Sequence, residues 1–231
     1  MVATRFLTIA EFETEARDGR WELIDGEPVE VAPSSDRSSW IATEIAFHIR
    51  DYLRDRPTGR VFGADAGFVL FPDRQIVRVP DAAFVKFERL PELTEGFIAV
   101  PPDLAVEVLS PTDRLPNALS TAYCKRPDLP GNKPVSRAQS RDLVASAGER
   151  GLSTPLETRG DSWRPNFFAH RCNASMYLQA GAPLVWLIDP RKHTATIFRQ
   201  DEGPVTIGED GVLDGEEVLP GFTLPLAKLL A

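Results

Sequence analysis

The stretch PDLAVEVLSP, Pro102–Pro111, is the part of the sequence that decides the fold. Apolar residues recur at every second position, at Leu104, Val106 and Val108, which is the period of a pleated β-strand. Both faces of such a strand would be largely apolar, so the stretch predicts an interior strand rather than an edge strand. Glu107 is the exception, because it places a carboxylate in the middle of a strand that we expect to be buried.

An ionised carboxylate at such a position is costly unless it is paired or bound to a metal ion. One interpretation of Glu107 is a structural residue at a sheet end, bonded to a nearby arginine or reached by water. The other interpretation is a metal ligand, and a second acid in the chain favours it. Asp81 also interrupts an apolar run, VRVPDAAFVKF at 77–87. We therefore expect Asp81 and Glu107 on neighbouring strands of one sheet.

Asp81 is a better partner for Glu107 than Asp103 is. Asp103 shares a strand face with Glu107, but four residues of strand span about 13 Å, which is too far for one metal site. Two carboxylates on adjacent strands can bring their oxygens to about 2.1 Å from Mg²⁺, with water completing its shell. The sequence thus predicts Asp81 and Glu107 as ligands of Mg²⁺ or Mn²⁺, an ion that activates water and stabilises charge on phosphate.

Length, charge and cysteine content limit the class of protein. The 231 residues are enough for one sizeable core. A net charge of −8 argues mildly against tight nonspecific binding to duplex DNA, although a local basic groove or bridging metal ions would still allow contact with phosphate. No apolar run approaches the ~20 residues that span a bilayer. Cys124 and Cys172 are too few for a disulfide framework, so we expect a cytoplasmic protein.

The remaining patterns predict an α/β fold, a mixed sheet with flanking helices and an N-terminal hairpin. We expect a helix from Thr8, with a capping box of Thr8 and Glu11, to near Asp18, and a hairpin at Trp21–Val31 with a tight turn at Asp25 and Gly26. Acids on this hairpin, such as Glu22, are usually solvated, and a functional role is the alternative. The other expected elements are a helix at Ser38–Asp55, a strand at Ile76–Phe87, a helix stop at Gly181 and a hairpin at 184–199. In residues 116–172 the apolar residues follow neither the spacing of a helix nor that of a strand over any sustained length. They predict an irregular insert without its own core, which interrupts a single domain spanning 1–231.

Four segments resemble, in order, the signature segments of the Uma-type restriction endonuclease family, part of the PD-(D/E)XK nuclease superfamily. They are WELIDGEPVEVAP, VPDAAFV, PPDLAVEVLSPTDR and YLQAGAPLVWLIDP. The resemblance covers residues 5–114 and 174–200 and implies a restriction-endonuclease-like core. It also implies an endonuclease that hydrolyses DNA with Mg²⁺ or Mn²⁺, with Asp81 and Glu107 as catalytic metal ligands. Many nucleases of this superfamily cut both strands as dimers, so it implies a homodimer.

The chain departs from the family pattern in its basic residues. Leu109 stands where the superfamily lysine would follow the Glu, and the family takes that lysine from the next helix, one turn before Tyr177. Asn173 occupies that position and cannot supply a positive charge. Lys86 and Arg89 follow Asp81 and could contact phosphate, although isolated basic residues at a strand end are usually only solvated. Two hypotheses remain, an endonuclease impaired by the insert and the missing lysine, or a catalytically inactive binding module with a nuclease fold.

Overall fold

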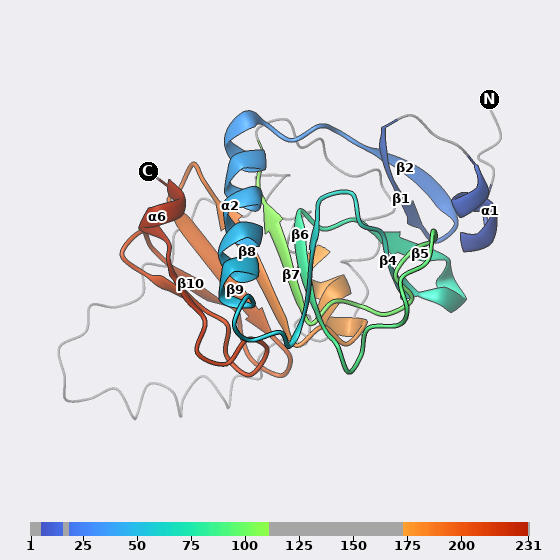
Figure 1. Cartoon of the computed structure of the whole chain (residues 1–231). Coiled ribbons are helices and arrows are strands. Elements are labelled where there is room, and N and C mark those ends of the chain that lie inside the picture. Colours follow the sequence, from blue (N-terminus) through green and yellow to red (C-terminus); the bar gives the residue numbers. More distant parts are fainter. Residues whose placement is uncertain (1–5, 16–18, 111–172, 231) are drawn as a thin grey trace, which may run out of the picture.

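A six-stranded mixed sheet forms the centre of the molecule, which is a computed structural model that describes residues 6–15, 19–110 and 173–230 (Figure 1). In spatial order its strands are β10 (Val205–Ile207), β9 (Thr194–Arg199), β8 (Leu184–Asp189), β7 (Leu104–Val108), β6 (Ala82–Lys86) and β3 (Gly59–Gly63). Strands β7 and β8 run parallel, and every other neighbouring pair is antiparallel. The sheet is therefore mixed, as the sequence predicts.

Strand β7 lies in the interior of this sheet, between β6 and β8. All five of its residues are buried, including Glu107, which is 6% exposed. The prediction of an interior strand within 102–111 is confirmed, while Asp81 lies just before β6, the strand next to β7, rather than on it. Ala82 of β6 is paired with Val106 of β7, so the residue before Ala82 adjoins Glu107.

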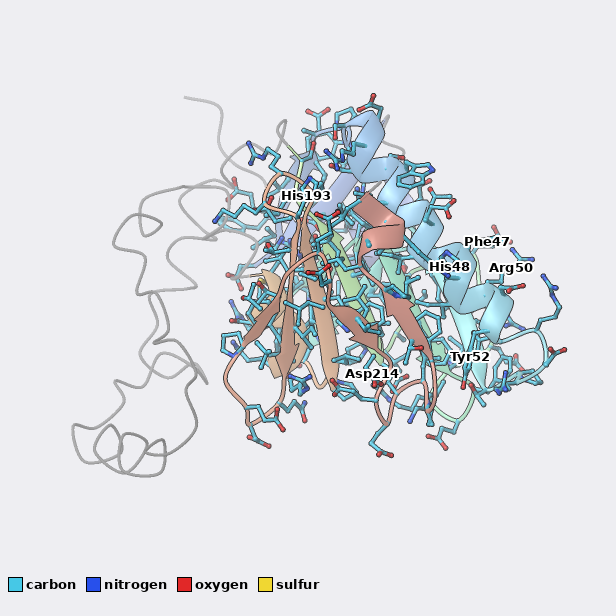
Figure 2. The ribbon with its side chains drawn as sticks, turned by 90° about the vertical axis from the view of Figure 1, so that its left-hand side faces the viewer. Phe47, His48, Arg50, Tyr52, His193 and Asp214 are labelled. Carbon is cyan, nitrogen blue, oxygen red and sulfur yellow. The ribbon has the colours of Figure 1, made fainter. Side chains whose placement is uncertain are left out.

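Helices cover both faces of the six-stranded sheet. On one face α2 (Asp36–Tyr52) packs the stripe Ile41, Ile45 and Ile49 into a core with the even-numbered residues of β7. The two-stranded sheet of β11 (Val212–Asp214) and β12 (Thr223–Pro225) and the short helix α6 (Ala227–Leu230) join that core. Figure 2 shows Phe47, His48 and Arg50 on the outer side of α2, pointing away from the sheet.

The opposite face packs against the helix at 173–179, drawn in orange beside β7 in Figure 1. This helix ends in a Schellman motif, in which Gly181 has a φ of +104°. The N–H of Gly181 donates to the carbonyl of Leu178, and the N–H of Ala182 donates to that of Tyr177. The sequence predicted Gly181 as the helix stop, and this prediction is confirmed.

A second, four-stranded antiparallel sheet holds the N-terminal hairpin. Its order is β2 (Glu27–Val31), β1 (Arg20–Ile24), β5 (Ile76–Arg78) and β4 (Phe68–Phe71), with the 3-10 turn η1 (Pro72–Arg74) between β4 and β5. Asp25 and Gly26 both have positive φ, as the two-residue turn predicted for the hairpin requires. Helix α1 (Ile9–Thr14) carries the predicted capping box of Thr8 and Glu11, but it ends at Thr14 because Glu15 is extended.

The prediction of a single strand at Ile76–Phe87 is wrong. The chain instead forms β5 in the four-stranded sheet and β6 in the six-stranded sheet, and crosses between them at 79–81. Pro80 lies in the crossing and has no N–H to donate to a ladder, so a continuous strand is disfavoured there.

Two further predictions concern the rest of the chain. The insert expected at 116–172 lies outside the described residues. Among the residues that the structure describes, no helix is both long and apolar enough to cross a membrane.

Candidate active site

Asp81 and Glu107 come together where β5 crosses into β6. The odd-numbered residues of β6 and β7 face the helix at 173–179, since Ala83 and Ala105 belong to the core on that side. Glu107 is odd-numbered and shares that face, and the N–H of Asp81 donates to the carbonyl of Val106 at 3.0 Å. Asp81, the residue just before β6, therefore lies beside Glu107 of β7, and the negative charge of Glu107 acts on its carboxyl group.

The Asp81 carboxylate is held at both oxygens. Its Oδ2 accepts a hydrogen bond from the N–H of Val108 at 2.8 Å, and its Oδ1 accepts one from Nη1 of Arg20 at 3.1 Å. Burial, and then the negative charge of Glu107, raise the pKa of Asp81 to about 6, against the opposing effect of Arg20. A carboxyl whose ionisation is opposed by a second carboxyl gains most from a cation placed between them.

Glu107 is oriented by Tyr177 from the helix at 173–179. The Tyr177 hydroxyl donates to Oε1 of Glu107 at 3.0 Å, and the Tyr177 side chain is fully buried. Burial, followed by the charge of Glu107, raises the pKa of Tyr177, so its hydroxyl stays protonated and acts as the donor. Glu107 is therefore a buried residue of β7 that a tyrosine orients, and its charge also acts on Arg20 and Arg78.

Glu22 is a component of this region that the sequence analysis placed wrongly in solvent. It is 7% exposed, and its Oε2 lies 3.0 Å from Nη1 of Arg78, which is itself 3% exposed. Burial raises the pKa of Glu22. Burial alone would lower the pKa of Arg78, but the Glu22 carboxylate raises this pKa, so Arg78 remains charged. Arg78 also bonds to Tyr177 through its side chain, so it links Glu22 to the residue that orients Glu107.

The same polar side chains satisfy the backbone at the crossing between the sheets. The N–H of Val79 donates to Oε1 of Glu22 at 3.1 Å, and Nη2 of Arg20 donates to the carbonyl of Val79. Asp81 accepts the N–H of Val108, as described above. Buried backbone groups need such partners, so part of the burial of Glu22, Arg20 and Asp81 has a structural reason.

The positive charge beside Asp81 comes from Arg20 on β1. Although burial acts against its charged form, the charges of Asp81, Glu107 and Glu22 raise the pKa of Arg20. Its side chain is 17% exposed, so it lies at the edge of the buried cluster rather than within it. The sequence analysis did not single out Arg20, because its contacts depend on the pairing of β1 with β5.

Lys86 and Arg89 lie at the other end of β6. Arg89 is bonded to Asp103 at 2.6 Å, and Nζ of Lys86 donates to the carbonyl of Glu217. Neither of the two interpretations, a phosphate contact beside Asp81 or a merely solvated residue, therefore describes these side chains. Asn173 begins the helix at 173–179, one turn before Tyr177, and is 7% exposed. Its Oδ1 is buried and has no hydrogen-bond partner among the described residues.

The donor set of Asp81 and Glu107 fits a small divalent ion. Mg²⁺ is usually bound by one or two carboxylates together with water and substrate phosphates, rather than by a closed protein cage. Across the described ranges, no cluster of three or more His, Cys, Asp or Glu side chains offers such a cage. Two carboxylates side by side would therefore suit such an ion, with water and substrate as its further ligands.

Comparison with known proteins agrees with this fold and its class. The sequence matches the family described as "Uma2: Putative restriction endonuclease" over residues 5–129 and 156–227. The fold is similar to the crystal structure of "a putative nuclease belonging to DUF820" from Anabaena variabilis, with 17% sequence identity, a TM-score of 0.61 and 97% of each chain covered. No curated protein matches the sequence.

The fold is therefore that of a restriction-endonuclease-like protein, and it is similar to the fold of the Anabaena protein. The chain belongs to the Uma2 family, since the match covers most of its length. This confirms the resemblance that the four signature segments indicate.

Proposed function

We propose that this chain is a divalent-metal-dependent endonuclease that hydrolyses phosphodiester bonds of DNA. The observation that carries the proposal is that Asp81, just before β6, lies next to Glu107 on the neighbouring strand β7. The raised pKa of Asp81, caused by burial and then by Glu107, supports it, because two acids held together favour a bound cation. Membership of the Uma2 family supports the reaction and DNA as the substrate.

The residues of the chain have separate roles in this proposal. Asp81 and Glu107 would hold Mg²⁺ or Mn²⁺, and when bound the ion supplies charge at the phosphate and acidifies a water nucleophile. The Val108 N–H fixes the direction of the Asp81 carboxylate, and the Tyr177 hydroxyl fixes that of Glu107. Such fixed orientation allows a site to stabilise developing charge without rearranging during the reaction.

A cleavage assay tests the proposal. The purified chain would be incubated with supercoiled, linear and single-stranded DNA in Mg²⁺, Mn²⁺ or EDTA. We expect cleavage with a divalent ion and none in EDTA. We also expect none with Glu107→Gln, which keeps the size of the side chain and one oxygen that can accept from Tyr177 but removes the charge. Equal cleavage by the wild type and Glu107→Gln would contradict the proposed site.

Asn173 favours a second candidate, a binding module with an impaired active site. Asn173 is buried on the helix that carries Tyr177, and its uncharged amide leaves Oδ1 without a partner among the described residues. If the missing lysine limits the reaction, Asn173→Lys will speed cleavage by about tenfold or more, because a cation stabilises the charge that develops on phosphate. A matched Asn173→Gln variant should stay at the wild-type rate. Equal rates for all three proteins would show that Asn173 does not limit the reaction.

A further inference from the structure

The buried charges around Asp81 form a cluster with one unbalanced negative charge. The acids are Glu22, Asp81 and Glu107, and the bases are Arg20 and Arg78. With all five ionised, the net charge is one negative unit. A divalent ion would reverse it to one positive unit, and a phosphodiester would then neutralise it. The cluster therefore has the charge that a phosphodiester requires once an ion is bound, provided that one arginine can reach the phosphate.

Arg78 cannot be that arginine. It is 3% exposed, and it is bonded to Glu22 at 3.0 Å and to Tyr177. Removing it from Glu22 would leave a buried carboxylate without its counter-ion, which is strongly destabilising. Arg78 therefore acts as a fixed internal charge of the fold.

Arg20 differs from Arg78 in exposure and in the number of bonds that it makes. Its side chain is 17% exposed. Its two hydrogen bonds, from Nη1 to Asp81 and from Nη2 to the Val79 carbonyl, use two of the five N–H groups of a guanidinium. Its Nε has no hydrogen-bond partner among the described residues. The planar fork of arginine suits the oxygens of a phosphate group.

We propose that Arg20 is the residue through which this site binds a phosphodiester group of DNA. This inference rests on the proposed function, because the phosphate would lie next to the ion that Asp81 and Glu107 hold. Arg20 acts as the counter-ion of Asp81 without a divalent ion, and it contacts phosphate when an ion takes over that carboxylate. The positive charge of the site then comes from the N-terminal hairpin rather than from the helix that carries Asn173.

The test is DNA binding under conditions without cleavage. The affinity of the full chain for a short fluorescein-labelled duplex would be measured by anisotropy in Ca²⁺ over a series of salt concentrations. The variants are Arg20→Gln, Arg20→Lys and the control Arg89→Gln, which alters a comparable arginine–aspartate pair at the other end of β6 and β7. Thermal unfolding of each variant would confirm that it is folded.

We expect Arg20→Gln to bind the duplex about fivefold more weakly. The slope of log affinity against log salt concentration should also become shallower by about one unit, which is the effect of one lost phosphate contact. Its affinity for Mn²⁺, measured by calorimetry, should rise severalfold because a competing positive charge is gone. Arg20→Lys should keep the salt dependence but lose part of the affinity. Arg89→Gln should change none of these quantities.

Several results would overturn the inference. One is that Arg20→Gln binds DNA with the affinity and salt dependence of the wild type. Another is that Arg89→Gln loses as much DNA affinity as Arg20→Gln does. The third is that the wild type does not bind DNA. If Arg20→Gln does not fold, unchanged affinity in Arg20→Lys would overturn it instead. A chain that binds DNA through Arg20 but never cleaves would refute the proposed function alone. A chain that cleaves DNA and does not depend on Arg20 for binding would refute the inference alone.

Discussion

The two ends of the β6–β7 pair each carry an aspartate bonded to an arginine, but they differ in what else is near. At one end Asp103 is bonded to Arg89 at 2.6 Å and accepts the N–H of Lys86 at 2.8 Å. At the other end Asp81 is bonded to Arg20 and to the N–H of Val108, and it also faces Glu107. The second carboxylate is the difference, and it is the reason why we propose a cation-binding role for Asp81 and a structural role for Asp103.

The largest expected effect compares the two aspartates directly. Asp81→Asn should reduce Mg²⁺-dependent DNA cleavage by about 1,000-fold, because it removes a charge that holds the ion. Asp103→Asn should leave the cleavage rate nearly unchanged and lower the stability, because it weakens an ion pair in which the Asp103 side chain is 4% exposed. The measurement is single-turnover cleavage at saturating Mg²⁺. Similar losses in the two variants would remove the distinction between the two ends.

The next effect concerns the buried pair beneath the Asp81 end. Glu22→Gln should lower the free energy of unfolding by about 3 kcal/mol, because it leaves the charge of Arg78 buried without its partner. The control is Asp25→Asn, which breaks the more exposed pair with Arg74 and should cost about 0.5 kcal/mol. Urea denaturation measures both values. A similar small cost for both variants would mean that Glu22 and Arg78 are solvated, as the sequence analysis expected for Glu22.

The smallest effect is a pH dependence of stability. Burial, and then the charge of Glu107, raise the folded-state pKa of Asp81 from its ordinary value of 3.8 to about 6, so the folded protein holds this proton more tightly than the unfolded chain does. Stability therefore falls as pH rises from about 4 to about 6. Between pH 5 and pH 7 we expect Asp81 to account for a loss of about 1 kcal/mol, which Asp81→Asn should abolish. Denaturation in EDTA tests this, and an identical pH dependence in both proteins would contradict the raised pKa.

Local sequence patterns were sufficient for most of the fold. The alternation at 104–108, the capping box at Thr8, the turn at Asp25 and Gly26 and the stop at Gly181 depend on nearby residues alone, and the structure has each of them. The boundary between β5 and β6 was missed although Pro80 marks it, because the apolar pattern continues on both sides. The change of sheet depends on partners that are distant in the sequence.

The site could be predicted only in part for the same reason. Asp81 and Glu107 stand out because each interrupts an apolar run, and the structure brings them together. Glu22 and Arg20 look like ordinary hairpin residues, and their burial follows from the pairing of β1 with β5. One signal was present. Arg78 lies within an apolar run, VRVP, and a buried arginine requires a carboxylate partner from elsewhere in the chain.

The central claim is that Asp81 and Glu107 together hold one divalent ion, and Mn²⁺ binding measured by titration calorimetry tests it most directly. We expect one ion per chain for the wild type and for Asp103→Asn, and no measurable binding for Asp81→Asn or Glu107→Gln. Binding that survives in either of the last two variants, or that is lost in Asp103→Asn while the protein stays folded, would contradict the claim.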